Sequence, residues 1–299
     1  MTTRRLLLAG GAATLLSACA PPVIQHAAPA LWTPSASVKA QLDAIEARVG
    51  GRLGICALDT ATARRIMHRE TERFAMCSSF KWMLVAAILK SVEDGFLRLD
   101  TFVRYTPADI LPHSPVTQAH VSEGGLPLEA LCAAAIEQSD NCAANLLLVA
   151  VNGPAGLTSF LSSHGDGVTR LDRNEVALNQ NAQGDLRDTT TPDATIRTMQ
   201  TLLLGDVLNA ASREKLIGWM VAGQTGLDRL RAGLAGWRAG DKTGTGSRGA
   251  VNDVAIAYPP GRAALLIACY MSETTATTDA CSAAQAQIAR LIAEIFAYG

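Results

Sequence analysis

The chain contains 299 residues with a mass of 31.4 kDa, a size that suits one large domain or two interlocked lobes. Hydrophobic residues make up 48% and charged residues 18%, so the composition excludes a largely disordered protein. The 26 Lys and Arg against 27 Asp and Glu leave a net charge of −1, which predicts no nucleic-acid partner. The only long apolar stretch is at the N-terminus, which excludes a multi-span membrane protein.

Residues 1–19 have the organisation of a signal peptide. Arg4 and Arg5 precede a short apolar run, and small residues then lead to Cys19. The run is too short to cross a bilayer of about 30 Å, which argues against a membrane anchor. The paired arginines resemble a twin-arginine export signal, and Leu-Ser-Ala-Cys resembles a lipoprotein box that would make Cys19 a lipidated N-terminus. Ordinary cleavage near Ala18 or Ala20 is the alternative.

Export predicts a periplasmic protein, attached to a membrane only through a lipid on Cys19. Residues 20–36, rich in proline and alanine, are expected to form a flexible tether. The other six cysteines show no C-x-x-C spacing, and the five histidines show no H-x-H or H-E-x-x-H pair. The sequence therefore predicts no metal site and no cofactor, and we expect a monomer.

Hydrophobic periodicity places strands at both ends of the mature chain and helices between them. Helical spacing marks residues 38–49, and residues 53–58 read as a strand. The remaining expected helices are 81–92, 128–138, 141–151, 157–162, 192–204, 212–221 and 276–296, and the remaining strands are 237–242, 251–258 and 263–271.

This order predicts an α/β (α+β) fold. N- and C-terminal strands would form an antiparallel sheet flanked by helices, with an all-helical lobe inserted and the site between the two parts. The expected boundaries are 37–69 and 220–299 for the α/β lobe and 70–219 for the helical lobe, which includes a loop at 172–188.

The first chemical motif is Ser78-Ser79-Phe80-Lys81 at the start of an expected helix. Residues i and i+3 share a helix face, so the Ser78 hydroxyl and the Lys81 amine can approach each other. A serine hydroxyl becomes a nucleophile when a neighbouring base takes its proton. Taken alone, the motif also fits a serine cap followed by a solvated lysine.

Two further motifs are Ser139-Asp140-Asn141, between two expected helices, and residues 242–246 (Lys-Thr-Gly-Thr-Gly), at the end of a strand. The first also fits an ordinary helix cap. In the second, a lysine and threonines could hold a carboxylate while the glycines let a ligand lie against the backbone; a solvated turn is the alternative.

A fourth pattern lies in the polar stretch 172–188, which is expected to be a long surface loop. It contains Arg173, Glu175 and Asn179 and ends at Asp188. By itself Glu175 also fits a solvated loop carboxylate.

Together, S-x-x-K, S-D-N and K-T-G in this order resemble the class A serine β-lactamases and the penicillin-binding proteins. The resemblance covers about residues 38–297. It implies a small-molecule β-lactam substrate and a hydrolase acting on its cyclic amide through a serine acyl-enzyme, conferring antibiotic resistance. Glu175 and Asn179 match the loop element that activates water in β-lactamases, which favours a β-lactamase over a penicillin-binding DD-peptidase acting on peptidoglycan.

The resemblance also implies roles for the catalytic residues. Ser78 would attack the lactam carbonyl and pass its proton either to Lys81 or, through water, to Glu175; both routes stay open. The backbone N–H groups of Ser78 and Thr245 would form the oxyanion hole. Ser139 would relay a proton to the leaving nitrogen. Glu175, assisted by Asn179, would activate water for hydrolysis of the ester.

Substrate-binding roles follow in the same way. The resemblance assigns the substrate carboxylate to Lys242, Thr243 and Thr245, and the acylamino carbonyl to Asn141. Arg173 and Asp188 match an ion pair that ties the two ends of the loop together.

The sequence departs from the family pattern at three places. The strand after K-T-G lacks the arginine that helps hold the carboxylate, and Arg229 matches an alternative position for it. His113 is where relatives often place an aromatic side chain at the cleft mouth; a stacking role or a plain exposed histidine would both fit. Cys77 resembles a cysteine that carbapenem-hydrolysing members pair with a second one, but Gly246 occupies that place, so Cys77 is expected to be an unpaired buried thiol.

Overall fold

The computed structural model describes residues 35–298. All of them belong to the compact unit Trp32–Gly299, and the expected signal peptide, Cys19 and most of the expected tether lie outside the described residues. Over the described part of the chain, no single helix has the length and apolar character to cross a membrane; one bent pair of helices, Asn141–Ala150 with Gly153–Ser163, meets both criteria by length and composition only.

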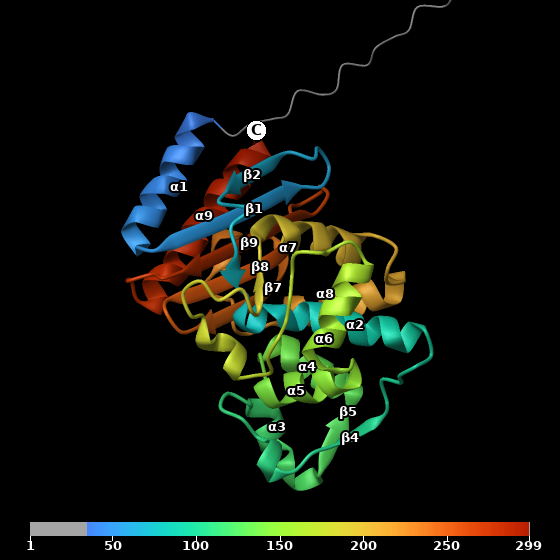
Figure 1. Ribbon diagram of the computed structural model, residues 1–299. Coiled ribbons are helices and arrows are strands. Elements are labelled where there is room, and N and C mark those ends of the chain that lie inside the picture. The colour runs from blue at the N-terminus through green and yellow to red at the C-terminus, as the bar shows by residue number, and fades with distance from the viewer. Residues whose placement is uncertain (1–34, 299) are drawn as a thin grey trace, which may run out of the picture. The chain divides into compact units, whose positions relative to one another are not determined.

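A five-stranded antiparallel sheet forms the centre of the upper half of Figure 1. Its strand order is β2-β1-β9-β8-β7, and every neighbouring pair is antiparallel. The strands are β1 (Arg52–Asp59), β2 (Arg65–His68), β7 (Arg238–Gly246), β8 (Ala250–Tyr258) and β9 (Leu265–Ser272). The predicted antiparallel sheet of N- and C-terminal strands is confirmed. The short edge strand β2 was not predicted, because four residues with charged ends carry no clear alternation.

Two terminal helices cover one face of this sheet. They are α1 (Ala36–Val49) and α9 (Thr278–Tyr298), and Figure 1 shows them side by side. Leu42 and Ile45 of α1 are buried in one cluster with Ile288 and Ile292 of α9 and with the inward side chains of the strands. This burial fixes the first strand beside the last although they are far apart in sequence.

The remaining helices pack into a second, larger core on the other face and below it. Helix α2 (Lys81–Glu93) runs through this core and is buried on all sides from Lys81 to Leu89. Packed against it lie α4 (Leu128–Glu137), α5 (Asn141–Ala150), α6 (Gly153–Ser163) and α8 (Ala210–Ala222). Helix α3 (Pro115–Ala119) contacts α4, and α7 (Pro192–Met199) packs against β1 and β9 of the sheet.

Short elements connect these helices. Two-residue and three-residue strands pair as β3 (Phe74–Ala75) with β6 (Thr189–Thr190) and as β4 (Phe102–Arg104) with β5 (Gly125–Pro127). Single helical turns lie at η1 (Cys77–Phe80), η2 (Pro107–Asp109), η3 (Val121–Glu123), η4 (Ala177–Gln180) and η6 (Leu230–Gly233).

The predicted helix over 192–204 differs in detail. The α-helix ends at Met199, and the chain continues as a π-helical turn, η5 (Gln200–Leu204), before Gly205. The widened turn still buries Leu202 and Leu203. The hydrophobic pattern that predicted one helix therefore fits an α-helix followed by a π-helical turn.

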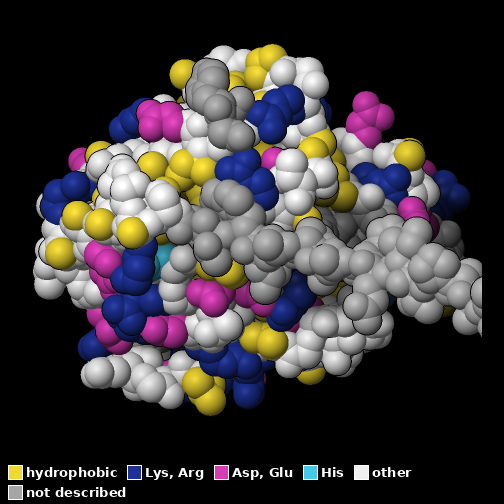
Figure 2. Space-filling view, turned by 90° about the horizontal axis from the view of Figure 1, so that it is seen from above, with side chains coloured by type: hydrophobic (Ala, Val, Ile, Leu, Met, Phe, Trp, Pro, Cys, Tyr) yellow, Lys and Arg dark blue, Asp and Glu magenta, His cyan; other side chains and the backbone are white. Residues whose placement is uncertain are grey.

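Charged side chains on the face seen from above are intermixed in sign (Figure 2). The described residues also form exposed or half-buried ion pairs, such as Lys39 with Asp43, Arg69 with Glu46, and Arg52 with Glu72. Exposed pairs of this kind contribute little stability each, so the two hydrophobic cores hold the fold.

Asp140 caps α5 and ties it to the segment around α3. The side chain is fully buried. One carboxylate oxygen accepts hydrogen bonds from the Ala143 N–H at 2.8 Å and the Thr117 hydroxyl at 2.9 Å, and the other accepts the N–H groups of Val116 and Thr117 at 3.0 and 2.9 Å. The residue between Ser139 and Asn141 is therefore the structural anchor of that motif.

We expect Asp140→Ala to lower the free energy of unfolding by about 3 kcal/mol, because it leaves several buried donors without an acceptor. Urea unfolding measures the change. The matched control is Asn209→Ala, which removes the exposed cap of α8 and should cost about 1 kcal/mol. Equal losses in the two variants would contradict the anchoring role.

Candidate active site

Ser78 lies in the turn η1, directly before α2, so its position is at the N-terminal, electropositive end of a long buried helix. The Ser79 hydroxyl donates to the Met76 carbonyl at 2.8 Å and holds this turn. Gly244 of β7 packs against the same carbonyl: a Cβ at Gly244 would lie 2.5 Å from Met76 O. The glycine of Lys-Thr-Gly therefore allows β7 to lie against the serine turn.

Lys81 is fully buried, one turn after Ser78. Its Nζ atom lies 2.6 Å from Asn141 Oδ1, 2.8 Å from the Ser139 carbonyl oxygen and 3.1 Å from Glu175 Oε1. Burial lowers the pKa of Lys81, while the charge of Glu175 opposes that shift. The amine is therefore closer to losing its proton than a surface lysine.

Glu175 brings the loop to the same point. The Ser78 hydroxyl donates to Glu175 Oε1 at 2.9 Å, and the Asn179 amide donates to Oε2 at 2.6 Å. The Glu175 backbone is held at both ends by Asn145 of α5, which accepts from its N–H and donates to its carbonyl, each at 2.9 Å. One carboxylate oxygen thus contacts both the hydroxyl and the amine that the sequence expected to meet there.

Ser139 lies between two amines. Its Oγ atom is 3.0 Å from Lys242 Nζ and 3.5 Å from Lys81 Nζ, and its backbone adopts a positive φ of 56°. Burial, followed by the charge of Lys81, lowers the pKa of Lys242 to about 7. A hydroxyl between two lysines of lowered pKa can pass a proton in either direction.

A pocket of about 250 Å³ opens beside these groups. Its lining combines the three motifs with residues from two other segments: Ser78, His113, Ser139, Asn141, Asn179, Thr225, Arg229, Thr243, Gly244 and Thr245. Every substrate-binding residue expected from the sequence lines this pocket, except Lys242, which is buried behind it.

Arg229 reaches the pocket from the segment before η6. It is 7% exposed, and its guanidinium donates to the carbonyls of Gly244 at 3.0 Å and Asn252 at 2.7 Å and to Thr245 Oγ1 at 2.7 Å. Thr225, from the same segment, shares a 2.6 Å hydrogen bond with Thr243. The Arg229 guanidinium therefore reaches this end of the pocket from a segment outside the sheet.

His113 lies at the exposed rim of the pocket. Its Nε2 atom is 3.0 Å from the Gln138 carbonyl oxygen, and its backbone carbonyl accepts the Asn141 N–H at 3.0 Å. The ring is thus tethered to the loop that carries Ser139.

The loop is closed by a buried ion pair. Asp188 is fully buried and accepts hydrogen bonds from Arg173 Nε at 2.5 Å and from the N–H groups of Asp172 and Arg173 at 2.7 and 2.9 Å. The chain then pairs as β6 with β3, immediately before the turn of Ser78. The end of the loop and the turn of Ser78 are therefore held together by one pair of short strands, β6 and β3.

Cys77 is buried and unpaired, as expected. Burial raises the pKa of its thiol to about 12, which keeps the thiol protonated and unreactive. A Cβ at Gly246 would lie 2.6 Å from Cys77 Sγ, so the two positions do face each other.

Sequence reasoning missed three supporting residues. Asn145 and Thr225 hold Glu175 and Thr243 as described. Asn252 of β8 donates to the carbonyls of Ala75 and Met76 at 2.8 and 3.1 Å. The available signal was a polar side chain inside an apolar stretch, since Asn145 and Asn252 both interrupt hydrophobic runs.

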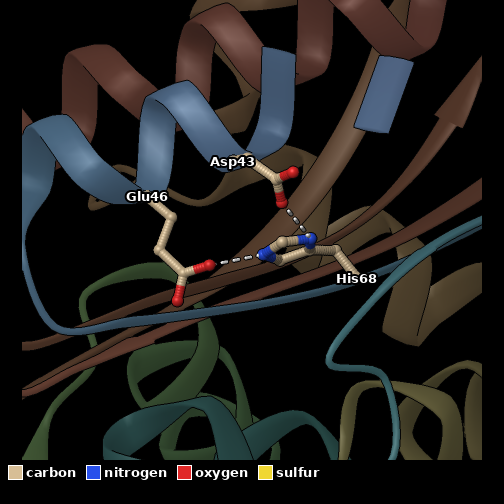
Figure 3. A group of neighbouring side chains, drawn as sticks. All are labelled: Asp43, Glu46 and His68. Atoms are coloured by element: carbon tan, nitrogen blue, oxygen red, sulfur yellow. Dashed lines mark hydrogen bonds and ion pairs between the residues drawn. The ribbon is translucent and has the colours of Figure 1, made fainter. Parts of the chain in front are cut away.

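A group of possible metal ligands, Asp43, Glu46 and His68, lies at the contact of α1 with β2, on different elements from the pocket. Figure 3 shows the two ring nitrogens facing different carboxylates, at 2.7 Å for Glu46 and 3.8 Å for Asp43. Lys39 and Arg69 already pair with these carboxylates. The arrangement fits an ion-pair clamp between helix and edge strand better than a site for a single cation.

Comparison with known proteins identifies the family and the relatives to which this chain is similar. The family model described as "Beta-lactamase enzyme family" matches residues 37–296. Beta-lactamase L2 of Stenotrophomonas maltophilia is 43% identical over 97% of this chain and 98% of its own length. The carbapenem-hydrolyzing beta-lactamase KPC of Klebsiella oxytoca is 40% identical over 94% of this chain and 95% of its own.

Solved structures agree. An ancestral class A β-lactamase superimposes with a TM-score of 0.85 at 54% identity, covering 87% of this chain and 100% of that one. A β-lactamase from Xanthomonas campestris has a TM-score of 0.85 at 46% identity, covering 87% and 97% of the two chains.

We expect Asp188→Ala to destabilise the protein by about 3–5 kcal/mol, because Arg173 loses its buried partner. Hydrogen exchange should accelerate selectively in residues 172–188. Arg187→Ala serves as the control in the same loop; it removes an exposed side chain that pairs with Asp185, so the loss should be about 1 kcal/mol or less. Unchanged exchange in the Asp188 variant would contradict the closing role of this pair.

Proposed function

Since this chain belongs to the beta-lactamase enzyme family and is a class A serine β-lactamase, we propose that its hydrolysis of the β-lactam amide bond proceeds through an acyl-enzyme on Ser78. The observation that carries this proposal is the position of Glu175 Oε1, 2.9 Å from Ser78 Oγ and 3.1 Å from Lys81 Nζ. The relatives named above support a β-lactamase and not the DD-peptidase alternative.

In the acylation step, Ser78 Oγ attacks the lactam carbonyl of a penicillin or cephalosporin. Its proton can go to Glu175, which already accepts the hydroxyl hydrogen bond, or to Lys81, whose pKa is lowered by burial and whose amine lies 3.1 Å from the same Glu175 oxygen. Both groups touch the same oxygen, so a proton taken by one can pass to the other.

The carbonyl oxygen acquires negative charge as the hydroxyl attacks. The backbone N–H groups of Ser78 and Thr245 are the proposed donors, because both residues line the pocket. One donor of this kind contributes about 3–4 kcal/mol to the stabilisation of the transition state. The leaving nitrogen then receives its proton from the Ser139 hydroxyl, which Lys81 or Lys242 reprotonates.

Hydrolysis of the ester requires a base on the loop. Glu175 serves as this base, with Asn179 orienting the carboxylate through its 2.6 Å hydrogen bond. Arg173 and Asp188 hold the loop ends, so the carboxylate keeps its distance from the ester. No step in this scheme routes through a metal or cofactor.

Substrate recognition divides between the two sides of the pocket. Lys242, Thr243, Thr245 and Arg229 bind the substrate carboxylate. The Asn141 amide donates one proton to the Pro112 carbonyl at 2.8 Å, which leaves its second N–H for the acylamino carbonyl. His113, at the rim, is placed to stack on the acylamino substituent.

We further propose that the chain is exported to the periplasm by residues 1–19, through a twin-arginine route, and that Cys19 carries a lipid. The mature enzyme then acts as a monomer whose residues 20–36 precede an α/β lobe (37–69 and 220–299) and a helical lobe (70–219). Homologues of the exported class A group support the location.

Glu175→Ala should acylate with a penicillin and then stall, because Ser78 and the oxyanion donors remain. Intact-mass spectrometry should show nearly complete conversion to the acyl-enzyme, with steady-state turnover reduced by about 10³-fold. Ser78→Ala is the control and should gain no mass. Free turnover by the Glu175 variant would contradict its role as the base.

Arg229→Ala should raise KM for carboxylate-bearing substrates by about tenfold, equivalent to about 1.4 kcal/mol, with a smaller effect on kcat. Steady-state kinetics with a penicillin and with the corresponding ester separate the two contributions. Arg238→Ala, an exposed arginine on β7, should behave like the parent. If the Arg229 variant keeps the parental KM, another group holds the carboxylate.

Lys242 should lose its charge as the pH rises through about 7. We therefore expect KM for carboxylate substrates to increase on the alkaline side of that pH, since a neutral amine holds a carboxylate less tightly. Lys242→Arg keeps its charge throughout and should show a flatter KM profile between pH 6 and about pH 9. Parallel profiles would exclude Lys242 as the titrating group.

A further inference from the structure

Behind the carboxylate-binding end of the pocket, two aspartates lie buried between β7 and β8. Asp241 is 2% exposed and Asp253 is 0% exposed. In the antiparallel register Thr243 pairs with Asp253, so Asp241 and Asp253 are diagonal neighbours on the same face of the sheet. The proposed mechanism uses neither of them.

The hydrogen bonds of this pair are incomplete if both side chains are ionised. Asp253 Oδ2 accepts the Leu230 N–H at 3.1 Å, and Asp241 Oδ1 accepts Arg231 Nη1 at 3.2 Å. Asp253 Oδ1 is buried and receives no hydrogen bond from any residue within 35–298. Asp241, the diagonal neighbour on the same face, is the carboxyl that lies beside it. A proton between the two carboxyls would satisfy that oxygen.

The surrounding groups do not replace this proton. The Arg229 guanidinium donates its hydrogen bonds in this structure to the Gly244 and Asn252 carbonyls and to Thr245. Lys242, from the opposite face of β7, donates to Ser139. On β9 the residue across from Asp253 is Cys269, whose buried thiol has a raised pKa and is neutral.

The electrostatics agree with the geometry. Burial, and then the charge of Asp241, raises the pKa of Asp253 well above its usual value. Burial also raises the pKa of Asp241, against the opposing charges of Arg231 and Lys242. Asp241 has the direct cationic partner, so Asp253 is the member that holds the proton.

We infer that Asp241 and Asp253 share a single proton, with Asp253 as the neutral acid, and that Asp253 is a positioning residue that fixes Arg229 through the Leu230 N–H. The second half rests on the proposed function, because it assumes that Arg229 binds the substrate carboxylate. With one proton shared, one negative charge faces the cations of the pocket instead of two. The pocket thereby keeps its positive potential for an anionic substrate.

Asp253→Asn tests the shared proton without reference to activity. The asparagine oxygen can accept the Leu230 N–H, and its NH₂ can donate to Asp241, which reproduces a neutral acid. Infrared spectra at pH 7 of the parent, labelled with ¹³C-aspartate, should contain an isotope-shifted band from a protonated carboxylic acid. That band should be missing from the variant. A parent spectrum without the band would overturn the shared proton.

The pH dependence of unfolding gives an independent readout. The pKa of Asp253 is raised on folding, so its contribution to stability is complete below the unfolded pKa of about 4 and declines as pH rises towards the folded pKa. Relative to Asp253→Asn, the parent should therefore lose stability with increasing pH, by up to about tenfold in the unfolding equilibrium constant per pH unit. Parallel curves for the two proteins between pH 5 and pH 9 would contradict the inference.

The positioning role is tested by a split between KM and kcat. Asp253→Ala should raise KM for a carboxylate-bearing penicillin by about tenfold with kcat changed less than threefold, and Asp253→Asn should restore the KM. If the alanine variant fails to fold, the comparison of parent with Asp253→Asn still decides the proton. An alanine variant with the parental KM would overturn the positioning role alone. A parental KM in Arg229→Ala would instead reject the proposed carboxylate site and leave the infrared result valid.

Discussion

The candidate active site depends on one buried carboxylate oxygen that contacts both a serine hydroxyl and a neighbouring amine. Glu175 Oε1 receives the Ser78 hydroxyl and lies beside Lys81, and the Glu175 and Lys81 side chains are inaccessible to solvent. An isolated buried charge of either sign would be strongly unfavourable, so each group stabilises the other. This constraint requires the loop to be held against α2, and much of the local structure provides that restraint.

Several independent contacts hold the loop in place. Asn145 fixes the Glu175 backbone, and the ion pair of Arg173 with Asp188 joins the two ends of the loop. The Asn179 carbonyl accepts the Ser247 N–H at 2.9 Å, just beyond the Lys-Thr-Gly segment. Because these contacts come from α5, from the loop itself and from the turn after β7, both parts of the fold position the Glu175 carboxylate.

The sequence predicted the fold class and the residues that the structure brings together around Ser78, but not every element. Ser78, Lys81 and Glu175 could be found because their types and order form a recognisable pattern, and most helices followed from hydrophobic periodicity. The edge strand β2 and the π-helical turn η5 could not, since each is set by tertiary packing and not by local pattern. The supporting contacts of Asn145 and Asn252 were also out of reach, because they depend on side chains meeting across segments far apart in sequence.

Helix α5 presents two amides one turn apart. Asn141 accepts a hydrogen bond from the Lys81 amine, and Asn145 donates one to the backbone carbonyl of Glu175. Positions i and i+4 lie on one face, so a rotation or slide of α5 displaces both amides together. In the proposed mechanism, a shift of α5 would therefore affect both ester formation at Ser78 and ester cleavage by Glu175. A shift of α5 that admits a bulkier substrate would displace the Asn141 and Asn145 amides together. Substitutions at the rim of the pocket would leave both amides in place.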